Sequence, residues 1–523
     1  MSARRAPGLV WLAILVSLLA ACRLNDLEPI LRPPRLATQT AQARQAAAPP
    51  PTPTPAPAAS LTPAPTPAGG VPITRVNPNL TVWVDETSDA HIAALRRLGE
   101  AFTAATAIQV EFVFIEASLL PELMSTAALS QTLPDVVLHP LEFSLRWSQA
   151  GILNPEAAAQ AVAALGAETF APGALSLAAL PDGRPAALPS DGWQQLLLYR
   201  RDWFAAAGLP APDNFQRILA GAAAFYNLEN VTSGFVGATD ADSRATQRIF
   251  EHLAAANGCA LIDAKGELRL LEPVCLQALK FYYKLVFNYS PPGIQTDVSA
   301  IKAYLTGRTA MIMTTPRVLP ALAGLDAGFP PGCPECAADP AYLAQQTGFE
   351  TQISGYITTG VSANFSQINL LGITTAAEPA EALAFVTYWF NDGYVTWLGV
   401  EPERKAPLRL GSAENPRAFL DAWRALPLTG SDKSLSDLYG AALADQLNAG
   451  LATAPRWGFA QGQGALMGDI YAENVLSPLL QRLLSGYMNP SETLVEAYLD
   501  VVKFIPDYPY FPETLPTPDR SGG

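Results

Sequence analysis

The chain has 523 residues, of which 49% are hydrophobic, 9% aromatic and 15% charged. This length and composition are typical of a globular protein with more than one hydrophobic core. The formal net charge of −14 argues against nucleic acid as a partner. No segment after the first 21 residues is apolar for long enough to be a membrane-spanning helix.

The N-terminus has the pattern of an export signal. Arg4 and Arg5 precede an apolar run over residues 9–19, which is shorter than the ~20 residues that a permanent membrane helix needs. Leu19-Ala-Ala-Cys22 resembles the lipobox of bacterial lipoproteins. That resemblance implies a signal peptide over residues 1–21, a lipid on the Cys22 sulfur and an extracytoplasmic protein anchored to the cell membrane. An ordinary signal peptide with a chance cysteine is the alternative.

Residues 22–76 are rich in Pro, Ala and Thr. Proline lacks a backbone donor and fixes φ, so this stretch can form neither helix nor sheet. We expect an extended tether that holds the following domain away from the membrane.

Four cysteines remain after Cys22, an even number for an oxidising compartment. Proximity in the sequence predicts the disulfides Cys259–Cys275 and Cys333–Cys336. Cys333-Pro-Glu-Cys336 could alternatively be a redox motif. Its neighbours are Pro, Gly and Asp rather than a strand-to-helix turn, which favours a disulfide that staples a loop.

The first part of the domain alternates strands and helices. Strands are expected at residues 80–84, 109–115 and 135–138, and helices at 92–102 and 121–133. This order predicts an α/β fold with a parallel sheet. Ligands of such sheets bind beyond the carboxyl ends of the strands, so residues 86–88 and 139–143 should lie at the edge of a site.

Several sequence blocks resemble, in order, those of extracellular solute-binding proteins of the maltose and glycerol-phosphate type. The blocks are Thr81-Val-Trp-Val84, Leu133-Pro-Asp-Val-Val137, Gly151-Ile-Leu-Asn-Pro155, residues 182–190, residues 198–210, Ala303-Tyr-Leu-Thr-Gly-Arg-Thr-Ala-Met311, Leu371-Gly-Ile-Thr-Thr375, residues 380–390, Ala406-Pro-Leu-Arg409 and residues 489–504. Asn214-Phe215 departs from the usual Thr-Trp.

The resemblance implies a two-lobed periplasmic-binding-protein-like fold of type II, with a ligand cleft between the lobes. Lobe one would comprise residues 78–190 and 350–405, and lobe two residues 191–349 and 406–508, followed by a tail at 509–523. The chain would cross between lobes near residues 190–193 and 405–410. The resemblance also implies ABC permease subunits as partners, a saccharide as ligand, and a monomer that contacts the membrane only through its lipid.

Matching the family position by position gives most of the candidate ligand-binding residues. Asp240 is added because it follows a predicted strand over residues 234–238, and Tyr356 because it lies in a Gly-rich stretch. Aromatic rings would stack on the sugar, and carboxylates and amides would bind its hydroxyls. Arg317 stands where the family often has an aromatic ring, and it could pair with Glu142 or Asp240 across the cleft or bind an anionic group. The candidates are Glu86, Thr87, Ser88, His139, Glu142, Phe143, Asp191, Trp193, Asp240, Arg317, Tyr356 and Trp457.

No common catalytic motif is present, so the chain is expected not to be an enzyme and to need no cofactor. With only three histidines, none close to the cysteines, a metal site is not expected either. The alternatives left open are a secreted carbohydrate-active enzyme, a surface sensor or adhesin, and a binding protein for a phosphodiester, polyamine or amino acid.

Overall fold

The computed structural model describes residues 79–356 and 360–515. These belong to the unit Arg75–Gly523, whereas the unit Met1–Thr74 lies outside the described residues. The expected signal peptide, Cys22 and the whole of the tether therefore lie outside the described residues. No helix in the described part of the chain has both the length and the apolar character needed to cross a membrane.

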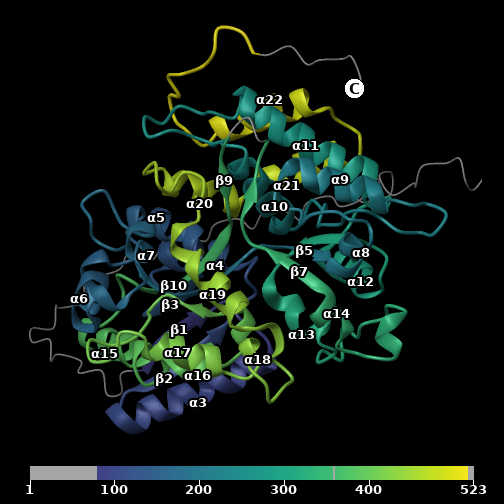
Figure 1. The fold of residues 1–523 in the computed structure, drawn as a ribbon. Coiled ribbons are helices and arrows are strands. Elements are labelled where there is room, and N and C mark those ends of the chain that lie inside the picture. The colour runs from purple at the N-terminus through teal and green to yellow at the C-terminus, as the bar shows by residue number, and fades with distance from the viewer. Residues whose placement is uncertain (1–78, 357–359, 516–523) are drawn as a thin grey trace, which may run out of the picture. The chain divides into compact units, whose positions relative to one another are not determined.

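A six-stranded sheet with the order β11-β4-β10-β3-β1-β2 forms the centre of what we call the first lobe (Figure 1). β1 is parallel to both β2 and β3, whereas β10 runs antiparallel between β3 and β4. The parallel part confirms the sheet predicted from the sequence. The strands are β1 (Asn79–Val84), β2 (Gln109–Phe114), β3 (Val136–Pro140), β4 (Leu188–Gln194), β10 (Ser366–Ile373) and β11 (Ala406–Pro407).

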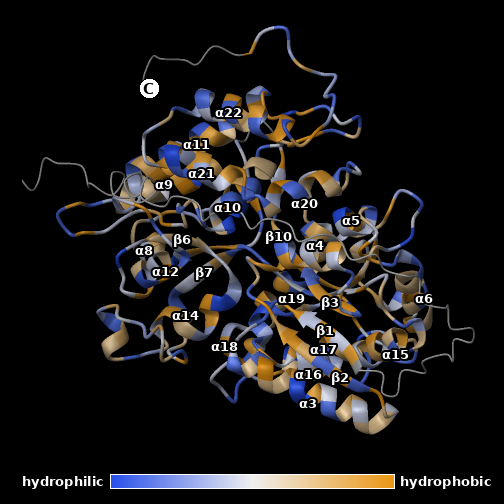
Figure 2. Cartoon of the chain, turned by 180° about the vertical axis from the view of Figure 1, so that it is seen from behind, coloured by the Kyte–Doolittle hydropathy of each residue, from blue (hydrophilic) through white to orange (hydrophobic). Residues whose placement is uncertain are grey.

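Buried and partly exposed side chains alternate along β1, which shows that one face of the strand is more deeply buried than the other. Leu80, Val82 and Val84 are buried, whereas Thr81 and Trp83 between them are partly exposed. The strands around β1 and β3 are accordingly mainly orange in Figure 2. The helices of this lobe are α3 (Asp89–Thr106), α4 (Leu120–Ser130), α5 (Leu141–Gln149), α6 (Pro155–Leu165), α7 (Ala174–Leu177), α15 (Pro379–Phe390), α16 (Tyr394–Leu398), α17 (Ala418–Ala425) and α19 (Ala441–Ala449).

A three-stranded sheet with the order β6-β5-β7 belongs to what we call the second lobe. Its strands are β5 (Leu196–Arg200), β6 (Met311–Thr314) and β7 (Thr347–Glu350), and a separate pair is formed by β8 (Ile353–Ser354) and β9 (Ser362–Ala363). The helices are α8 (Arg201–Ala206), α9 (Phe215–Phe225), α10 (Arg244–Ala256), α11 (Pro273–Tyr289), α12 (Asp297–Leu305), α13 (Leu319–Leu322), α14 (Tyr342–Gln346), α21 (Leu476–Leu484) and α22 (Pro490–Val502).

The chain first passes between the two sheets at Gln195, directly after β4 and just past the predicted window. It returns between β7 and β10, close to the predicted boundary at residue 350. At Gly192, an added Cβ would lie 2.4 Å from the carbonyl oxygen of Gln367. A glycine therefore allows β4 to approach β10 closely where the chain leaves the first lobe.

The expected crossing near residues 405–410 is not found there. β11 pairs with β4 at the edge of the first sheet, and α17 packs against β11 and α16. The short strand extends the first sheet by hydrogen bonding, so the first lobe continues past the predicted boundary. α18 (Leu435–Tyr439) then contacts both α19 and α14.

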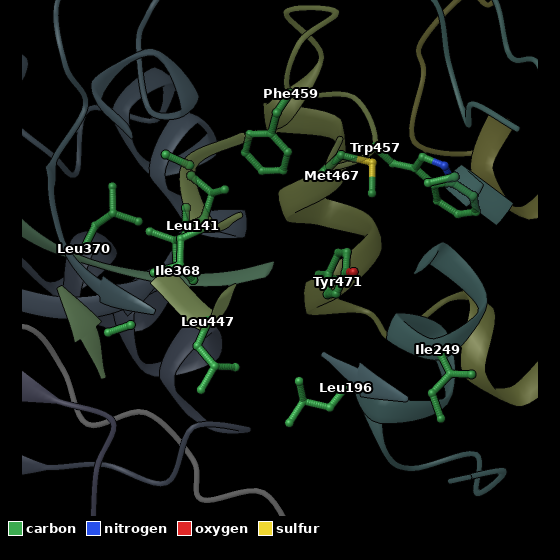
Figure 3. Close-up of a cluster of buried hydrophobic side chains, with 14 of the residues drawn as sticks. Leu141, Leu196, Ile249, Ile368, Leu370, Leu447, Trp457, Phe459, Met467 and Tyr471 are labelled. Atoms are coloured by element: carbon green, nitrogen blue, oxygen red, sulfur yellow. The ribbon is translucent and has the colours of Figure 1, made fainter. Parts of the chain in front are cut away.

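The C-terminal part of the chain alternates between the lobes. α20 (Gly464–Ala472) packs against α5 of the first lobe, whereas α21 and α22 pack against α10 and α11 of the second. Figure 3 shows the apolar side chains at this junction, with Met467 and Tyr471 of α20 between Leu141 and Ile249. The short 3-10 turns are η2 (Ala167–Thr169), η3 (Pro316–Val318), η4 (Glu335–Ala337), η5 (Pro402–Arg404) and η6 (Leu451–Thr453).

Both expected disulfides occur in the structure. Cys259–Cys275 joins the segment after α10 to the first turn of α11, with a Cα–Cα distance of 4.7 Å. Cys333–Cys336 closes a loop whose Cα–Cα distance is 5.0 Å. Both lie in the second lobe, where they tie neighbouring turns together.

Candidate functional site in the cleft between the lobes

The start of α10 carries two arginines on one side of the helix. Ser243 caps the helix by accepting a hydrogen bond from the backbone N–H of Ala245. Arg244 and Arg248 are four residues apart and therefore lie on neighbouring turns of the same face. Cations at a helix N-terminus oppose the helix dipole. The position of the two arginines is therefore better explained by the groups that they face than by a contribution to helix stability.

These arginines line a cleft of about 540 Å³. Its walls come from α10, from the first turn of α12, from the loop after β2 and from the end of α20. The lining residues are Ser118, Asp240, Asp242, Ser243, Arg244, Ala245, Arg248, Asp297, Ala472 and Asn474. The cleft therefore presents three carboxylates and two guanidinium groups, with a first-lobe loop and α20 opposite the second-lobe helices.

Both arginines also face aromatic rings of the first lobe. The guanidinium carbon of Arg248 is 5.6 Å from the ring centre of Trp193, and that of Arg244 is 5.9 Å from the ring centre of Phe143. Arg244 Nε in addition donates a 2.9 Å hydrogen bond to the carbonyl oxygen of Tyr471. Burial, followed by the neighbouring Arg248, lowers the pKa of Arg244.

Neighbouring positive charges offset the negative charges of the cleft carboxylates only in part. Burial raises the pKa of Asp297, although Arg248 and Arg317 act in the opposite direction. Burial and then Asp242 raise the pKa of Asp240. Among the residues that the structure describes, no hydrogen-bond partner reaches the buried Oδ1 of Asp240 or Nε of Arg248. A ligand carrying both hydroxyl donors and oxygen acceptors would satisfy both kinds of atom.

A buried ionic cluster centred on Arg456 lies near the cleft arginines, since Arg248 acts on its carboxylate Glu142. The Arg456 guanidinium donates to Glu142 of α5 at 2.9 Å and to Glu251 of α10 at 2.8 Å. Gln367 of β10 donates to the other carboxylate oxygen of Glu142 at 2.8 Å. Burial opposes the ionisation of Glu142, but Arg456 and then Arg248 outweigh it and hold the pKa of Glu142 below its ordinary value.

A second buried charged group lies where β1 ends in the first lobe. Burial, and then Glu86, raises the pKa of Asp85 to about 8. Lys405 Nζ lies 2.5 Å from His91 Nε2, and burial together with Lys405 lowers the pKa of His91 to about 4. Glu86 in turn is 3.5 Å from Arg404. These contacts keep the end of β1 in place beside the cleft.

Asp191 lies on β4 and belongs to the same part of the first lobe. It accepts hydrogen bonds from Trp397, Ser190 and Asn369 at 2.6, 2.7 and 3.1 Å, and burial raises its pKa. These contacts indicate that Asp191 has a structural role, which is to fix β4 where the chain leaves the first lobe.

Four of the predicted residues lie at or near the cleft arginines. Asp240 lines the cleft, Phe143 and Trp193 lie 5.9 and 5.6 Å from the guanidinium groups of Arg244 and Arg248, and Arg248 lowers the pKa of Glu142. Arg317 is exposed and acts on Asp297 rather than on Glu142.

The other predicted residues have local partners. Thr87 donates to Glu116, and Ser88 caps α3 beside His91. His139 is buried against Trp147, and burial lowers its pKa to about 4. Tyr356 lies edge-on to the ring of Phe215, outside the cleft lining.

Trp457 lies inside the second lobe. It is 3% exposed, its indole N–H donates a 2.9 Å hydrogen bond to the carbonyl oxygen of Cys259, and its ring meets that of Phe250 edge-on. These contacts are those of a core residue, and its side chain does not line the cleft described above.

Sequence reasoning missed Arg244, Arg248 and Arg456. A signal for the first pair was present, because Ser243 followed by two arginines four residues apart places cations at a helix start, where they are disfavoured. Arg456 had no such signal, since its two carboxylate partners are 314 and 205 residues away in the chain. In the described ranges no cluster of His, Cys, Asp and Glu could hold a metal ion.

Comparison with known proteins agrees with this fold. A curated relative, the putative ABC transporter periplasmic-binding protein YcjN of Escherichia coli (strain K12), is 27% identical over 217 residues. The match covers 41% of this chain and only 50% of that relative.

Solved structures share the fold over most of the chain. Maltose-bound MalE3 of T. maritima has a TM-score of 0.61 at 15% identity, covering 82% of this chain and 100% of that one. The GacH receptor of Streptomyces glaucescens GLA.O has a TM-score of 0.62 at 16% identity, with coverages of 83% and 100%. A ribitol complex from Agrobacterium radiobacter K84 has a TM-score of 0.58 at 19% identity, with coverages of 82% and 98%.

These likenesses show a two-lobed α/β fold of the type II periplasmic-binding class, with the ligand cleft between the lobes. The family model described as bacterial extracellular solute-binding protein matches residues 85–396. The chain therefore belongs to the bacterial extracellular solute-binding proteins.

Proposed function

We propose that this protein is the extracytoplasmic substrate-binding component of an ABC importer and that it captures a carbohydrate in the cleft between its lobes. The observation that carries the proposal is the set of polar groups that line the cleft, Arg248, Asp240 and Asp297, with the buried ring of Trp193 5.6 Å from the Arg248 guanidinium. The similarity to a protein named as an ABC periplasmic-binding protein supports the transport role.

The chemistry of the cleft suits a sugar or a related polyol. An aromatic ring face packs against the apolar face of a pyranose, while carboxylates accept from hydroxyls and guanidinium groups donate to them. Solved structures of the similar proteins include complexes with maltose, ribitol and acarbose. A carbohydrate ligand is therefore the simplest interpretation of the groups in the cleft and of the ligands bound by the similar proteins.

We favour a neutral sugar over an anionic one. Three carboxylates line the cleft against two arginines, so an added anion would meet more negative than positive charge. Arg317, the cation expected to select between these ligands, lies exposed near Asp297. Its charge therefore offsets a carboxylate and is not left over for a ligand.

Transport would use closure of the two lobes. A ligand that contacts both the α10 arginines and the first-lobe rings binds the closed form better, and it shifts the population towards that form. The permease subunits would then recognise the closed protein. Lipidation of Cys22 would keep the protein at the membrane, and mass spectrometry of the N-terminal peptide would detect the acyl chains.

A ligand screen by thermal unfolding tests the proposal. Maltose, ribitol, glucuronate and spermidine are each added to the protein, since they represent the neutral, polyol, anionic and cationic alternatives. A neutral ligand at 100 times its Kd should stabilise the folded state by about 2.7 kcal/mol. Stabilisation by glucuronate or spermidine alone would contradict the neutral-carbohydrate proposal, and release of hydrolysis products would favour the enzyme alternative.

A further inference from the structure

The two lobes are joined near the cleft arginines by charged groups of the protein itself. Arg456 is 2% exposed, and each of its three guanidinium nitrogens has a partner. Nη2 donates to Glu142 in the first lobe at 2.9 Å, Nε to Glu251 in the second lobe at 2.8 Å, and Nη1 to the carbonyl oxygen of Ser366 on β10 at 2.9 Å. One side chain thus contacts both lobes and a strand next to a crossing.

The carboxylates of this cluster are well satisfied. Glu251 also accepts from the backbone N–H of Trp457 at 3.1 Å and from the hydroxyl of Tyr471 at 2.5 Å. Glu142 accepts from Gln367 through its second oxygen. Charged groups removed from water need such complete hydrogen bonding, and losing one partner leaves the others buried and uncompensated.

The position of Arg456 in the chain shows which of its bonds must break if the lobes separate. The next residue, Trp457, is held inside the second lobe by its hydrogen bond to Cys259 and its contact with Phe250. Arg456 should therefore move with Glu251. Its bonds to Glu142 and to the carbonyl oxygen of Ser366 are therefore the ones that join the two lobes, and the bond to Glu142 is the ionic one.

The segment after Trp457 contains the glycines expected of a hinge between the two lobes. Gly458 and Gly462 have φ values of 76° and 73°, a backbone region that other residues enter only with strain. Between this segment and the first lobe comes α20, which packs on α5. The short glycine-bounded segment thus links an anchor in the second lobe to a helix on the first.

We propose that the Arg456–Glu142 ion pair is an internal latch that favours closed lobes before any ligand binds. This inference rests on the proposed function, because it describes how the same cleft closes. A ligand then completes closure by contacting Arg248 and Trp193. The latch sets the fraction of protein that is competent to bind, so weakening it reduces the apparent affinity by that same fraction.

Distance measurement between the lobes tests the latch without any ligand. Spin labels on cysteines introduced at Ala93 of α3 and Lys284 of α11, both exposed, report the separation of the lobes. Glu142→Gln keeps the shape of the side chain but removes its charge. We expect a larger population of long distances in this variant than in the parent protein.

Glu496→Gln is the matched control, because Glu496 pairs with Arg482 in an exposed contact of 3.0 Å within the second lobe. It should leave the distance distribution unchanged. Adding maltose to Glu142→Gln should restore short distances, with the apparent Kd raised about tenfold if the closed fraction falls tenfold.

An unchanged distribution in Glu142→Gln, accompanied by a lower melting temperature, would overturn the latch and leave the cluster a purely structural one. If instead the ligand-free distances lengthen but maltose fails to bind even the parent protein, the latch stands and the carbohydrate assignment fails. The two proposals can therefore fail separately.

Discussion

Arg456 and Arg248 both lower the pKa of the same carboxylate, Glu142, yet they differ in burial and in hydrogen bonding. Arg456 is buried, and all three of its guanidinium nitrogens donate to protein oxygens. Arg248 is partly exposed on the cleft, and no partner in the described part of the chain reaches its buried Nε. The first arginine completes the protein interior, whereas the second lines the cleft.

This difference separates residues that hold the protein together from residues that await a ligand. A buried charge with complete hydrogen bonding contributes to stability when its partners are present and is costly to disrupt. A partly solvated cation over a ring can change partners at little cost. The same division distinguishes the two tryptophans, since Trp457 is bonded within the second lobe and Trp193 lies beneath Arg248.

The largest effect should come from truncating the core tryptophan. Trp457→Ala would leave a cavity beside Phe250 and an unpaired carbonyl at Cys259, so we expect a loss of about 3–5 kcal/mol in the free energy of unfolding. Urea denaturation followed by circular dichroism measures it. A change below about 1 kcal/mol would place Trp457 in a ligand site instead, as its match to the family first suggested.

A smaller effect, confined to binding, is expected for Arg248→Ala. Removing a donor aimed at the cleft should weaken sugar binding by about 1–3 kcal/mol in calorimetry, with little change in melting temperature. Arg482→Ala is the matched control, because Arg482 lies in an exposed ion pair that contributes at most about 1 kcal/mol to stability. Equal loss of affinity in both variants would remove Arg248 from the site.

A third effect concerns the pH dependence of stability. Burial raises the pKa of Asp85 to about 8, whereas an unfolded aspartate titrates near ~3.9. The folded state therefore binds more protons than the unfolded state between these values, and this group makes stability fall as pH rises through that range.

Asp85→Asn should remove that part of the pH dependence. Melting temperatures recorded from pH 5 to pH 8 should fall less steeply for the variant than for the parent protein. Parallel curves for the two proteins would show that Asp85 ionises normally in the folded state.

Local patterns in the sequence predicted much of the first lobe. Apolar residues in strand and helix patterns predicted β1, β2 and α3, because strand and helix periodicity depend on neighbouring residues only. The two disulfides could also be predicted from the sequence, since each pairs cysteines separated by at most 16 positions.

Long-range pairing explains what the sequence did not predict. β11 has only two residues, too few for any strand pattern, and its place in the first sheet depends on hydrogen bonds to β4. The family match placed Trp457 in the cleft, but a match of residue types cannot show that its indole N–H reaches Cys259. Arg456 joins carboxylates from two lobes, which only the folded chain brings together.

We propose that a neutral carbohydrate binds in the cleft lined by Arg244 and Arg248, beside Trp193. Calorimetric titration of maltose into the parent protein and into Trp193→Ala tests this proposal. We predict one site per chain in the parent protein and an affinity lower by about 1–3 kcal/mol in the variant, which should still fold. Equal affinities in the two proteins, or no detectable binding of maltose while glucuronate or spermidine binds, would contradict the claim.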